Sequence, residues 1–279
     1  MRMFYRQRVL LKVLSLLPAE LRKDLRYLMK TVFLVNQEFV EENQVYKFYP
    51  HHYGPFSSVV YEDLRFFYAN GLVDEKTMNL APKAKPFYAD IGSGLITQTV
   101  TDAMDRFKSA SEIIDHVYAN FPAFTIRSKL RPPKRAQATG ASAVGYEGDT
   151  IDSFLNKLIQ DNVDVLVDVR RNAFSMKPHF RKDALARALQ NSGIEYLHVG
   201  ALGIDSEKRQ NLETPADYQQ LFEEYRQELP AKEKELGQVM ELAKSKRVAL
   251  MCFERDPHCC HRGVLAEKLK ELGQSVEFI

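Results

Sequence analysis

The sequence predicts an α/β protein whose C-terminal half folds as a mostly parallel sheet covered by helices on both faces, preceded by a mainly helical domain. Two patterns carry this prediction. From about residue 142 onward, short apolar segments rich in β-branched residues alternate with helical segments, as in a parallel sheet with crossover helices. Before about residue 126, apolar residues recur mainly at helical spacing. A chain of 279 residues is long enough for two such domains.

The N-terminal domain, residues 1–126, is expected to consist mainly of helices. Gly71 follows one amphipathic segment and is a suitable residue to end its helix. Short strand-like pieces surround residues 46–49 and 72–73. The helices are expected at residues 9–17, 21–33, within 57–71, and at 99–120.

Residues 127–141 are expected to form a linker between the two domains. Residues 127–135 contain five basic side chains, no acid and a Pro-Pro pair, and small residues follow. One interpretation is a solvated linker whose charge has no partner. The other is an arm that contacts phosphates.

The C-terminal domain, residues 142–279, should contain five strands and intervening helices. The strand before the cysteine-rich segment, residues 247–251, is apolar throughout and should be buried. The other strands are expected at residues 143–146, 163–169, 195–198 and 275–279. The helices are expected at residues 150–159, 183–191, 215–228, 231–244 and 263–272.

Composition and charge exclude several classes of protein. Hydrophobic residues make up 45% of the chain, which excludes global disorder. No apolar run approaches the roughly 18 residues of a membrane-spanning helix, and no signal peptide is recognised, so a membrane partner is not expected. All three cysteines fall within nine residues, which is poor material for a disulfide framework. Free thiols indicate a reducing compartment, and the cytoplasm is the expected location.

The cysteine-rich segment, residues 252–262, is the predicted functional site. It lies between the carboxyl end of a strand and the start of a helix, where open α/β sheets bind ligands. The thiols allow three interpretations. Cys252 with Cys259 or Cys260, and with His258 or His261, could ligate zinc, although no complete ligand set is identified. Cys260 could instead be a nucleophile at a helix start, or a small buried packing residue beside a ligand-binding His261.

Two carboxylates and two arginines complete the predicted site. Glu254 is the stronger candidate for acid–base catalysis, with Asp168 as its partner across the sheet edge. Arg170 and Arg262 are expected to bind a phosphate in bidentate fashion. The alternative for Asp168 and Arg170 is an ion pair that orders their loop. Because neighbouring parallel strands end at one edge, we expect these four side chains to line one pocket.

A glycine-containing turn and a basic loop flank this site. Gly145 would let a ligand approach the backbone closely and Tyr146 would offer a stacking face, although an ordinary tight turn explains the same residues. The turn lacks the spacing of dinucleotide and Walker phosphate loops, so no cofactor is expected. No metal is expected either, because the cysteine-rich segment offers no complete set of zinc ligands. Residues 177–182 add basic side chains that favour a phosphate-bearing ligand.

The C-terminal half resembles the domain-of-unknown-function 488 family. That resemblance implies an α/β fold and a site, but no reaction. Where members of the family often have Pro and Ser-Arg after the Asp-Val-Arg motif, this chain has residues 171–177. The residues that carry the resemblance are Gly145-Tyr-Glu-Gly148, Asp168-Val-Arg170, Gly193-Ile-Glu-Tyr196, Leu202-Gly203 and the segment from Cys252 to Arg262.

The N-terminal half is similar to winged-helix domains and to the domains associated with Panacea-type antitoxins. The similarity rests on Tyr53-Gly-Pro-Phe-Ser57, Asp63-Leu64 and Asn70-Gly-Leu-Val73. Together these features predict a cytoplasmic protein of prokaryotic type that acts on or recognises nucleic acid or a nucleotide. The alternative is a non-catalytic regulator whose N-terminal domain binds DNA or protein. The oligomeric state is left open.

Overall fold

The computed structural model divides into two compact units, residues 1–134 and 135–279. It describes residues 2–38, 45–91, 94–130, 138–209, 212 and 214–279. The boundary falls inside the expected linker, whose basic residues Arg131, Lys134 and Arg135 lie outside the described residues. Within the described part of the chain, no helix combines the length and the apolar character needed to cross a membrane.

The first residues of the expected linker pack on the N-terminal unit instead. Ser128 is buried, and the backbone N–H of Lys129 donates to the carbonyl oxygen of His52 at 2.9 Å. The expected start of the linker at residue 127 is therefore too early, because a hydrogen bond that joins residues 77 positions apart holds this segment in place.

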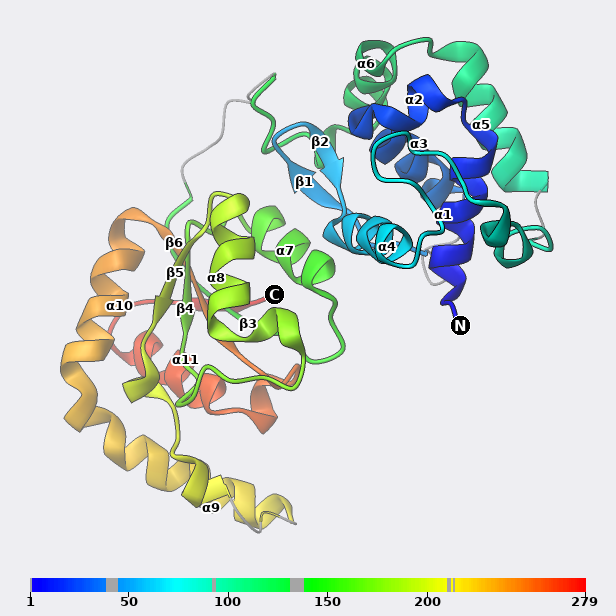
Figure 1. The fold of residues 1–279 in the computed structure, drawn as a ribbon. Coiled ribbons are helices and arrows are strands. Elements are labelled where there is room, and N and C mark those ends of the chain that lie inside the picture. The colour runs from blue at the N-terminus through cyan, green and yellow to red at the C-terminus, as the bar shows by residue number, and fades with distance from the viewer. Residues whose placement is uncertain (1, 39–44, 92–93, 131–137, 210–211, 213) are drawn as a thin grey trace. The chain divides into compact units, whose positions relative to one another are not determined.

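The N-terminal unit is mainly helical with a two-stranded antiparallel hairpin (Figure 1). The helix expected at 21–33 is two helices, because the Asp24 side chain caps the second by accepting from the backbone N–H groups of Arg26 and Tyr27. The helix expected at 99–120 is also two, with Ser109 as the second N-cap. The elements are α1 (Tyr5–Leu16), α2 (Ala19–Lys23), α3 (Leu25–Gln37), β1 (Tyr49–His51), β2 (Gly54–Phe56), α4 (Ser58–Ala69), α5 (Gly94–Arg106) and α6 (Ala110–Asn120).

The core of this unit contains an aromatic cluster. The ring of Phe33 meets the rings of Phe48, Phe121 and Phe124 edge-on, with centroids 4.9–5.2 Å apart. The hairpin β1–β2 holds the Gly-Pro-Phe segment on which the winged-helix similarity rests. The winged-helix assignment itself stays a prediction.

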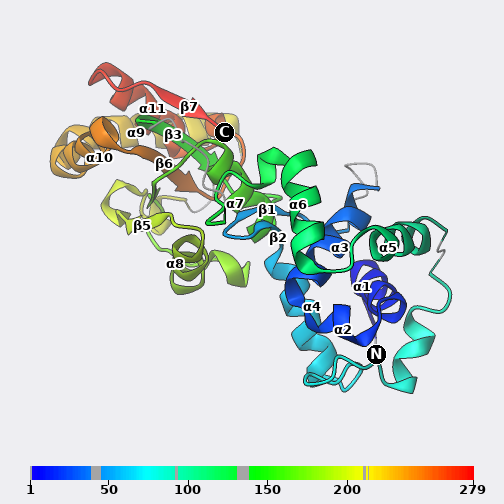
Figure 2. The same ribbon diagram turned by 90° about the horizontal axis from the view of Figure 1, so that it is seen from above.

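The C-terminal unit is the predicted α/β domain. Its five strands are all parallel, in the order β5-β4-β6-β3-β7. Seen from above, α7 and α8 lie on one face of the sheet and α9, α10 and α11 on the other (Figure 2). The elements are β3 (Gly140–Gly145), α7 (Ile151–Gln160), β4 (Val165–Asp168), α8 (Lys182–Asn191), β5 (Glu195–His198), α9 (Pro215–Glu228), α10 (Glu233–Ser245), β6 (Arg247–Cys252), α11 (His261–Glu271) and β7 (Val276–Phe278).

Successive side chains along a strand point to opposite faces of the sheet, so the position at which a strand ends decides which face its last side chain occupies. Val165, Val167 and Cys252 belong to the core on the α9–α11 face of the sheet. Asp168 follows Val167 directly, so its side chain points to the opposite face, toward α7 and α8. The last residue of β4 and the last residue of β6 therefore serve different faces.

Candidate functional site

A pocket of about 390 Å³ opens at the carboxyl ends of β3, β4 and β6. Of the residues predicted for the site, four line it, and Gly145, Asp168, Cys260 and Arg262 do not. The lining consists of Tyr146, Arg170, Arg171, Asn172, Phe174, Ser175, Met176, Lys177, Ile204, Arg209, Cys252, Phe253, Glu254 and His261.

Asp168 and Arg170 form a buried bidentate ion pair. The Arg170 Nε and Nη2 atoms lie 2.8 and 2.6 Å from the two Asp168 oxygens, and the side chains are 6% and 0% exposed. Asp168 also accepts hydrogen bonds from the Arg170 backbone N–H and from the Tyr196 hydroxyl. Burial opposes the Arg170 charge, but the hydrogen bonds and charge of Asp168 outweigh it and raise the pKa of Arg170.

Asp168 and Glu254 are not side by side in a cleft, so the expected acid–base pair is wrong. Asp168 points to the α7–α8 face and is saturated by Arg170 and Tyr196, whereas Glu254 lines the pocket. Arg170 also uses Nη1 on the Tyr146 hydroxyl and the Phe180 carbonyl, at 2.9 and 3.0 Å. Its donors are thus engaged by the protein, and the ion-pair interpretation describes the geometry.

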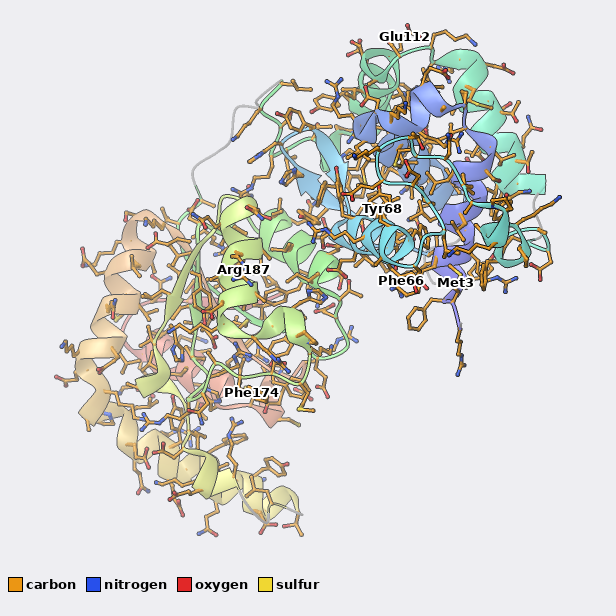
Figure 3. The ribbon with its side chains drawn as sticks, viewed as in Figure 1. Met3, Phe66, Tyr68, Glu112, Phe174 and Arg187 are labelled. Atoms are coloured by element: carbon orange, nitrogen blue, oxygen red, sulfur yellow. The ribbon has the colours of Figure 1, made fainter. Side chains whose placement is uncertain are left out.

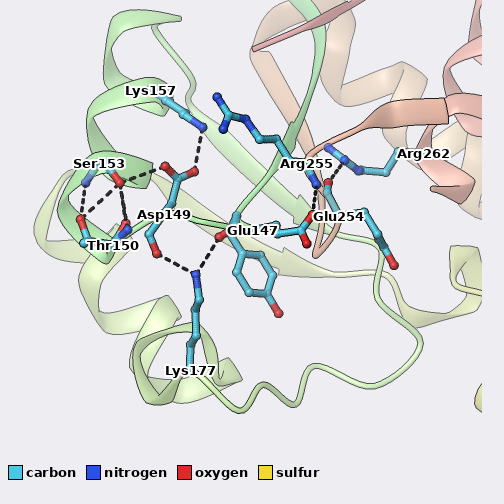
Figure 4. Close-up of polar contacts among 10 residues, drawn as sticks. Glu147, Asp149, Thr150, Ser153, Lys157, Lys177, Glu254, Arg255 and Arg262 are labelled. Carbon is cyan, nitrogen blue, oxygen red and sulfur yellow. Dashed lines mark hydrogen bonds and ion pairs between the residues drawn. The ribbon is translucent and has the colours of Figure 1, made fainter. Parts of the chain in front are cut away.

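Arg262 and Gly145 shape the loop that carries Glu254. Arg262 is buried in the first turn of α11 and donates to the Glu254 carbonyl oxygen (Figure 4). A methyl group on Gly145 would come within 2.0 Å of that same oxygen. The absence of a side chain at Gly145 therefore makes room for the Glu254 backbone and not for a ligand. Gly145 and Arg262 together hold the Glu254 backbone in place.

Tyr146 does line the pocket, but its stacking face is already covered. Its ring lies parallel to that of Phe180 with centroids 4.2 Å apart, and Phe253 meets it edge-on at 5.3 Å. Lys177 ties the same turn to the basic loop by donating to the Tyr146 and Asp149 carbonyl oxygens (Figure 4). The aromatic stack therefore forms one wall of the pocket.

Two of the three thiols lie close to His261; Cys252 and His261 line the pocket, and Cys260 is buried beside them. α11 begins at His261 with Cys260 as its N-cap, two residues earlier than expected. The Cys252 and Cys260 Sγ atoms each lie 3.8 Å from His261 Nδ1, and Arg262 Nε lies 3.3 Å from Cys260 Sγ. Cys259 is exposed and lies outside this cluster.

The electrostatics of the cluster separate its two thiols. Burial raises the pKa of Cys260, but hydrogen bonds from Cys252 and His261 and the charges of His261 and Arg262 lower it well below the usual thiol value. The hydrogen bond to Cys260, burial and the Glu254 charge raise the pKa of Cys252. Burial, then the charge of Cys260, raises the pKa of Glu254. Cys260 is thus the thiol of the pair that ionises first.

Arg209 is a site residue that the sequence did not reveal. Its Nη2 atom lies 3.1 Å from His261 Nδ1, and its Nη1 atom lies 3.6 Å from a Glu254 carboxylate oxygen. It ends a short 3-10 turn that carries no recognisable motif. Its basic character is the only signal of a binding role in the sequence around it. Arg209 lies 45 positions before Glu254 in the chain, and only the fold brings the two side chains together.

The mouth of the pocket is apolar and basic at once. Phe174 (Figure 3), Met176 and Phe253 are 63%, 84% and 41% exposed. Arg171 pairs with exposed Asp205 at 2.6 Å, beside the pocket. Large apolar side chains exposed together at a pocket indicate a surface that contacts a ligand.

Comparison with known families finds a match within the α/β unit. Residues 150–269 match the family model described as Domain of unknown function DUF488. Over these residues the α/β unit is similar to the DUF488 family. The matched part runs from the turn before α7 into α11 and includes Asp168, Glu254 and the cysteine cluster. The turn at Gly145 precedes it. No curated protein and no solved structure shows significant similarity to the chain.

Proposed function

We propose that the α/β unit binds a nucleotide unit, either free or within a nucleic acid, in the pocket at the carboxyl edge of its sheet, and acts on it there. The observation that carries this proposal is the combination of exposed rings and cations around one carboxylate. Phe174 and Phe253 offer faces for a base, and stacking of this kind is tolerant of sequence. A volume of about 390 Å³ suits a small ligand.

The cations suited to a phosphate are not the pair expected from the sequence. Arg170 is held by Asp168 and Arg262 is buried below the pocket. Arg209 and Lys177 line the pocket instead. Arg209 meets its carboxylate partner only at 3.6 Å, and Lys177 donates to backbone carbonyls. Both cations therefore face the ligand space with positive charge that an incoming phosphate would balance.

Glu254 is proposed as the catalytic carboxylate because of its position. It is the one carboxylate among the described residues that line the pocket, and its side chain is partly exposed there. A group that transfers protons must lie within hydrogen-bonding reach of the ligand. The alternative, a regulator that senses a nucleotide without changing it, keeps the pocket but needs no reaction at Glu254.

The test measures binding and turnover on the full chain. Isothermal titration calorimetry with mononucleotides and short single-stranded oligonucleotides should detect binding that weakens with salt. Phe174→Ala should weaken it about 5- to 100-fold, the effect of losing one stacking ring. Tyr218→Ala, a partly exposed tyrosine on α9, is the matched control and should change nothing.

Variants of Arg209 and Glu254 test phosphate binding and distinguish an enzyme from a non-catalytic sensor. Arg209→Gln should weaken phosphate-bearing ligands more than the nucleoside, while Arg226→Gln on α9 should not. If Glu254→Gln retains binding and abolishes turnover of the bound nucleotide, the domain is an enzyme. Binding without any turnover by the unaltered chain would favour the sensor. Failure of every nucleotide and oligonucleotide to bind at low salt would refute the proposal.

The N-terminal unit is proposed to add nucleic-acid contacts beside the hairpin β1–β2. Tyr53 at the hairpin turn is 48% exposed. Burial and then the charges of Lys129 and Arg127 lower the pKa of His52, so positive potential surrounds this turn. An exposed ring beside cations is a suitable surface for a nucleic acid strand. The free thiols of the chain are consistent with the proposed cytoplasmic location.

Salt dependence tests this second surface. Replacing Lys129, Arg131, Lys134 and Arg135 by glutamine should lower the slope of log affinity against log salt for an oligonucleotide. A mononucleotide bound in the pocket of the α/β unit needs no contact with this segment, so it should bind the variant with unchanged affinity. An unchanged slope for the oligonucleotide would exclude this segment from the interface.

A further inference from the structure

Three side chains that are typical metal ligands come together at the pocket, two of them in its lining and the third, Cys260, buried beside them. Cys252 ends β6, Cys260 caps α11, and His261 is the first residue of that helix. Their Sγ and Nδ1 atoms all lie within 4.8 Å of one another, and both sulfur atoms are 3.8 Å from Nδ1. In a tetrahedral zinc site, with bonds of about 2.3 Å to sulfur and 2.0 Å to nitrogen, ligand atoms lie roughly 3.5–3.8 Å apart.

The hydrogen bond of His261 occupies Nε2 and leaves Nδ1, the nitrogen nearer the two sulfur atoms, available to bind a metal. Its Nε2 atom lies 3.2 Å from the Val169 carbonyl oxygen, which can only accept a hydrogen bond. In the neutral ring that binds a metal, Nε2 would therefore carry the proton, and the Nδ1 lone pair would be available on the side of the two sulfur atoms. A histidine whose second nitrogen donates to a carbonyl is the usual arrangement at protein metal sites.

The surroundings of the sulfur atoms also fit a thiolate site. The buried Arg262 donates from Nε to Cys260 Sγ at 3.3 Å, and its positive charge favours the deprotonated form that binds metals. Glu254 lies on the pocket side, with a carboxylate oxygen 3.1 Å from Cys252 Sγ. A fourth ligand, either Glu254 or water, would thus face the pocket.

Arg209 competes with a metal ion for this position. Its Nη2 atom is 3.1 Å from Nδ1, where a metal ion would be bound. The Arg209 side chain is about a third exposed, so it can rotate into the pocket when a cation arrives. Metal and guanidinium should therefore exclude each other at His261.

We propose that Cys252, Cys260 and His261 bind a thiophilic divalent cation, of which zinc is the best fit, with the fourth position open to the pocket. Two thiolates and one imidazole select zinc or cobalt over magnesium or calcium, which prefer oxygen ligands. The inference goes beyond nucleotide binding and does not depend on it, because Cys252, Cys260 and His261 have no role in the proposed nucleotide contacts and cobalt absorption is measured without a nucleotide.

The experiment titrates cobalt and zinc into the full chain after treatment with a chelator and a reductant. One equivalent of cobalt should produce thiolate-to-cobalt charge-transfer absorption and the intense d–d bands of tetrahedral geometry, and zinc should abolish both. Cys252→Ser and His261→Gln should each lower zinc affinity by more than about 100-fold, since even changes outside the ligand shell cost 10- to 100-fold. Cys259→Ser, the exposed neighbouring thiol, should bind like the unaltered chain.

Arg209→Gln keeps the test decisive if a ligand variant fails to fold. This side chain is partly exposed, and its loss should raise zinc affinity because the competing guanidinium is gone. The proposal is overturned if the reduced chain shows no cobalt charge-transfer band, or if Cys252→Ser and Cys259→Ser bind zinc equally. A Cys252–Cys260 disulfide that mass spectrometry finds, and that reduction opens without restoring metal binding, would also overturn it.

Discussion

The buried ion pair between Asp168 and Arg170 leads to a quantitative prediction. Replacing Asp168 by asparagine removes the negative charge while keeping the shape of the side chain. Asp168 accepts four hydrogen bonds at 2.6–3.1 Å, two at each carboxylate oxygen. Asparagine has one side-chain oxygen, so it can accept only the two at one of these positions. Its amide group would instead face the Arg170 and Tyr196 donors.

The expected cost follows from these contacts. Two hydrogen bonds to a charged group are lost, each worth about 1.5–3 kcal/mol. Arg170 would remain a buried cation without its counter-ion, and breaking a buried pair in this way costs about 3–5 kcal/mol. We therefore expect Asp168→Asn to lower the free energy of unfolding of the α/β unit by about 3–5 kcal/mol.

Hydrogen exchange measured by mass spectrometry at increasing urea isolates this effect. Exchange in peptides from β4 and β6 reports the α/β unit, and peptides from α3 serve as an internal control in the other unit. Glu195→Gln is the matched variant, since it removes an exposed ion pair with Lys246 that is worth at most about 1 kcal/mol. A loss below about 1 kcal/mol for Asp168→Asn would refute the reasoning.

Three further predictions concern other parts of the chain. Lys30 is buried, and burial lowers its pKa to about 7. Because the unfolded chain keeps this proton up to about pH 10, the free energy of unfolding should rise between about pH 7 and about pH 10, by up to about 1.4 kcal/mol per pH unit. Urea denaturation of Lys30→Met should lack this rise, and an equal rise in both chains would contradict it. Gly145→Ala should cost about 1–3 kcal/mol by the same denaturation, because its methyl group meets the Glu254 carbonyl, whereas Gly237→Ala, with open space around it, should not destabilise the chain. Iodoacetamide should alkylate exposed Cys259 in the reduced chain before the two buried cysteines. Peptide mapping measures the order, and modification of Cys260 first would mean that its thiol is accessible to solvent.

The sequence alone determined the class of the C-terminal unit and predicted the place of its candidate site. Alternation of apolar strands with helices predicts a parallel sheet, and the carboxyl ends of parallel strands lie at one edge of the sheet whatever the strand order. For that reason Glu254, Arg170 and His261 could be placed near one pocket before any contact was known.

Only the tertiary structure decided which of these side chains face the pocket and which lie beneath it. Side chains alternate between sheet faces, so a single position separates Asp168 on one face from Val169 on the other. The start of α11 at His261, rather than two residues later, turns Arg262 into the interior. Arg209 reaches His261 across 52 residues. Such long-range contacts depend on how the helices pack on the sheet, and no local pattern in the sequence encodes them.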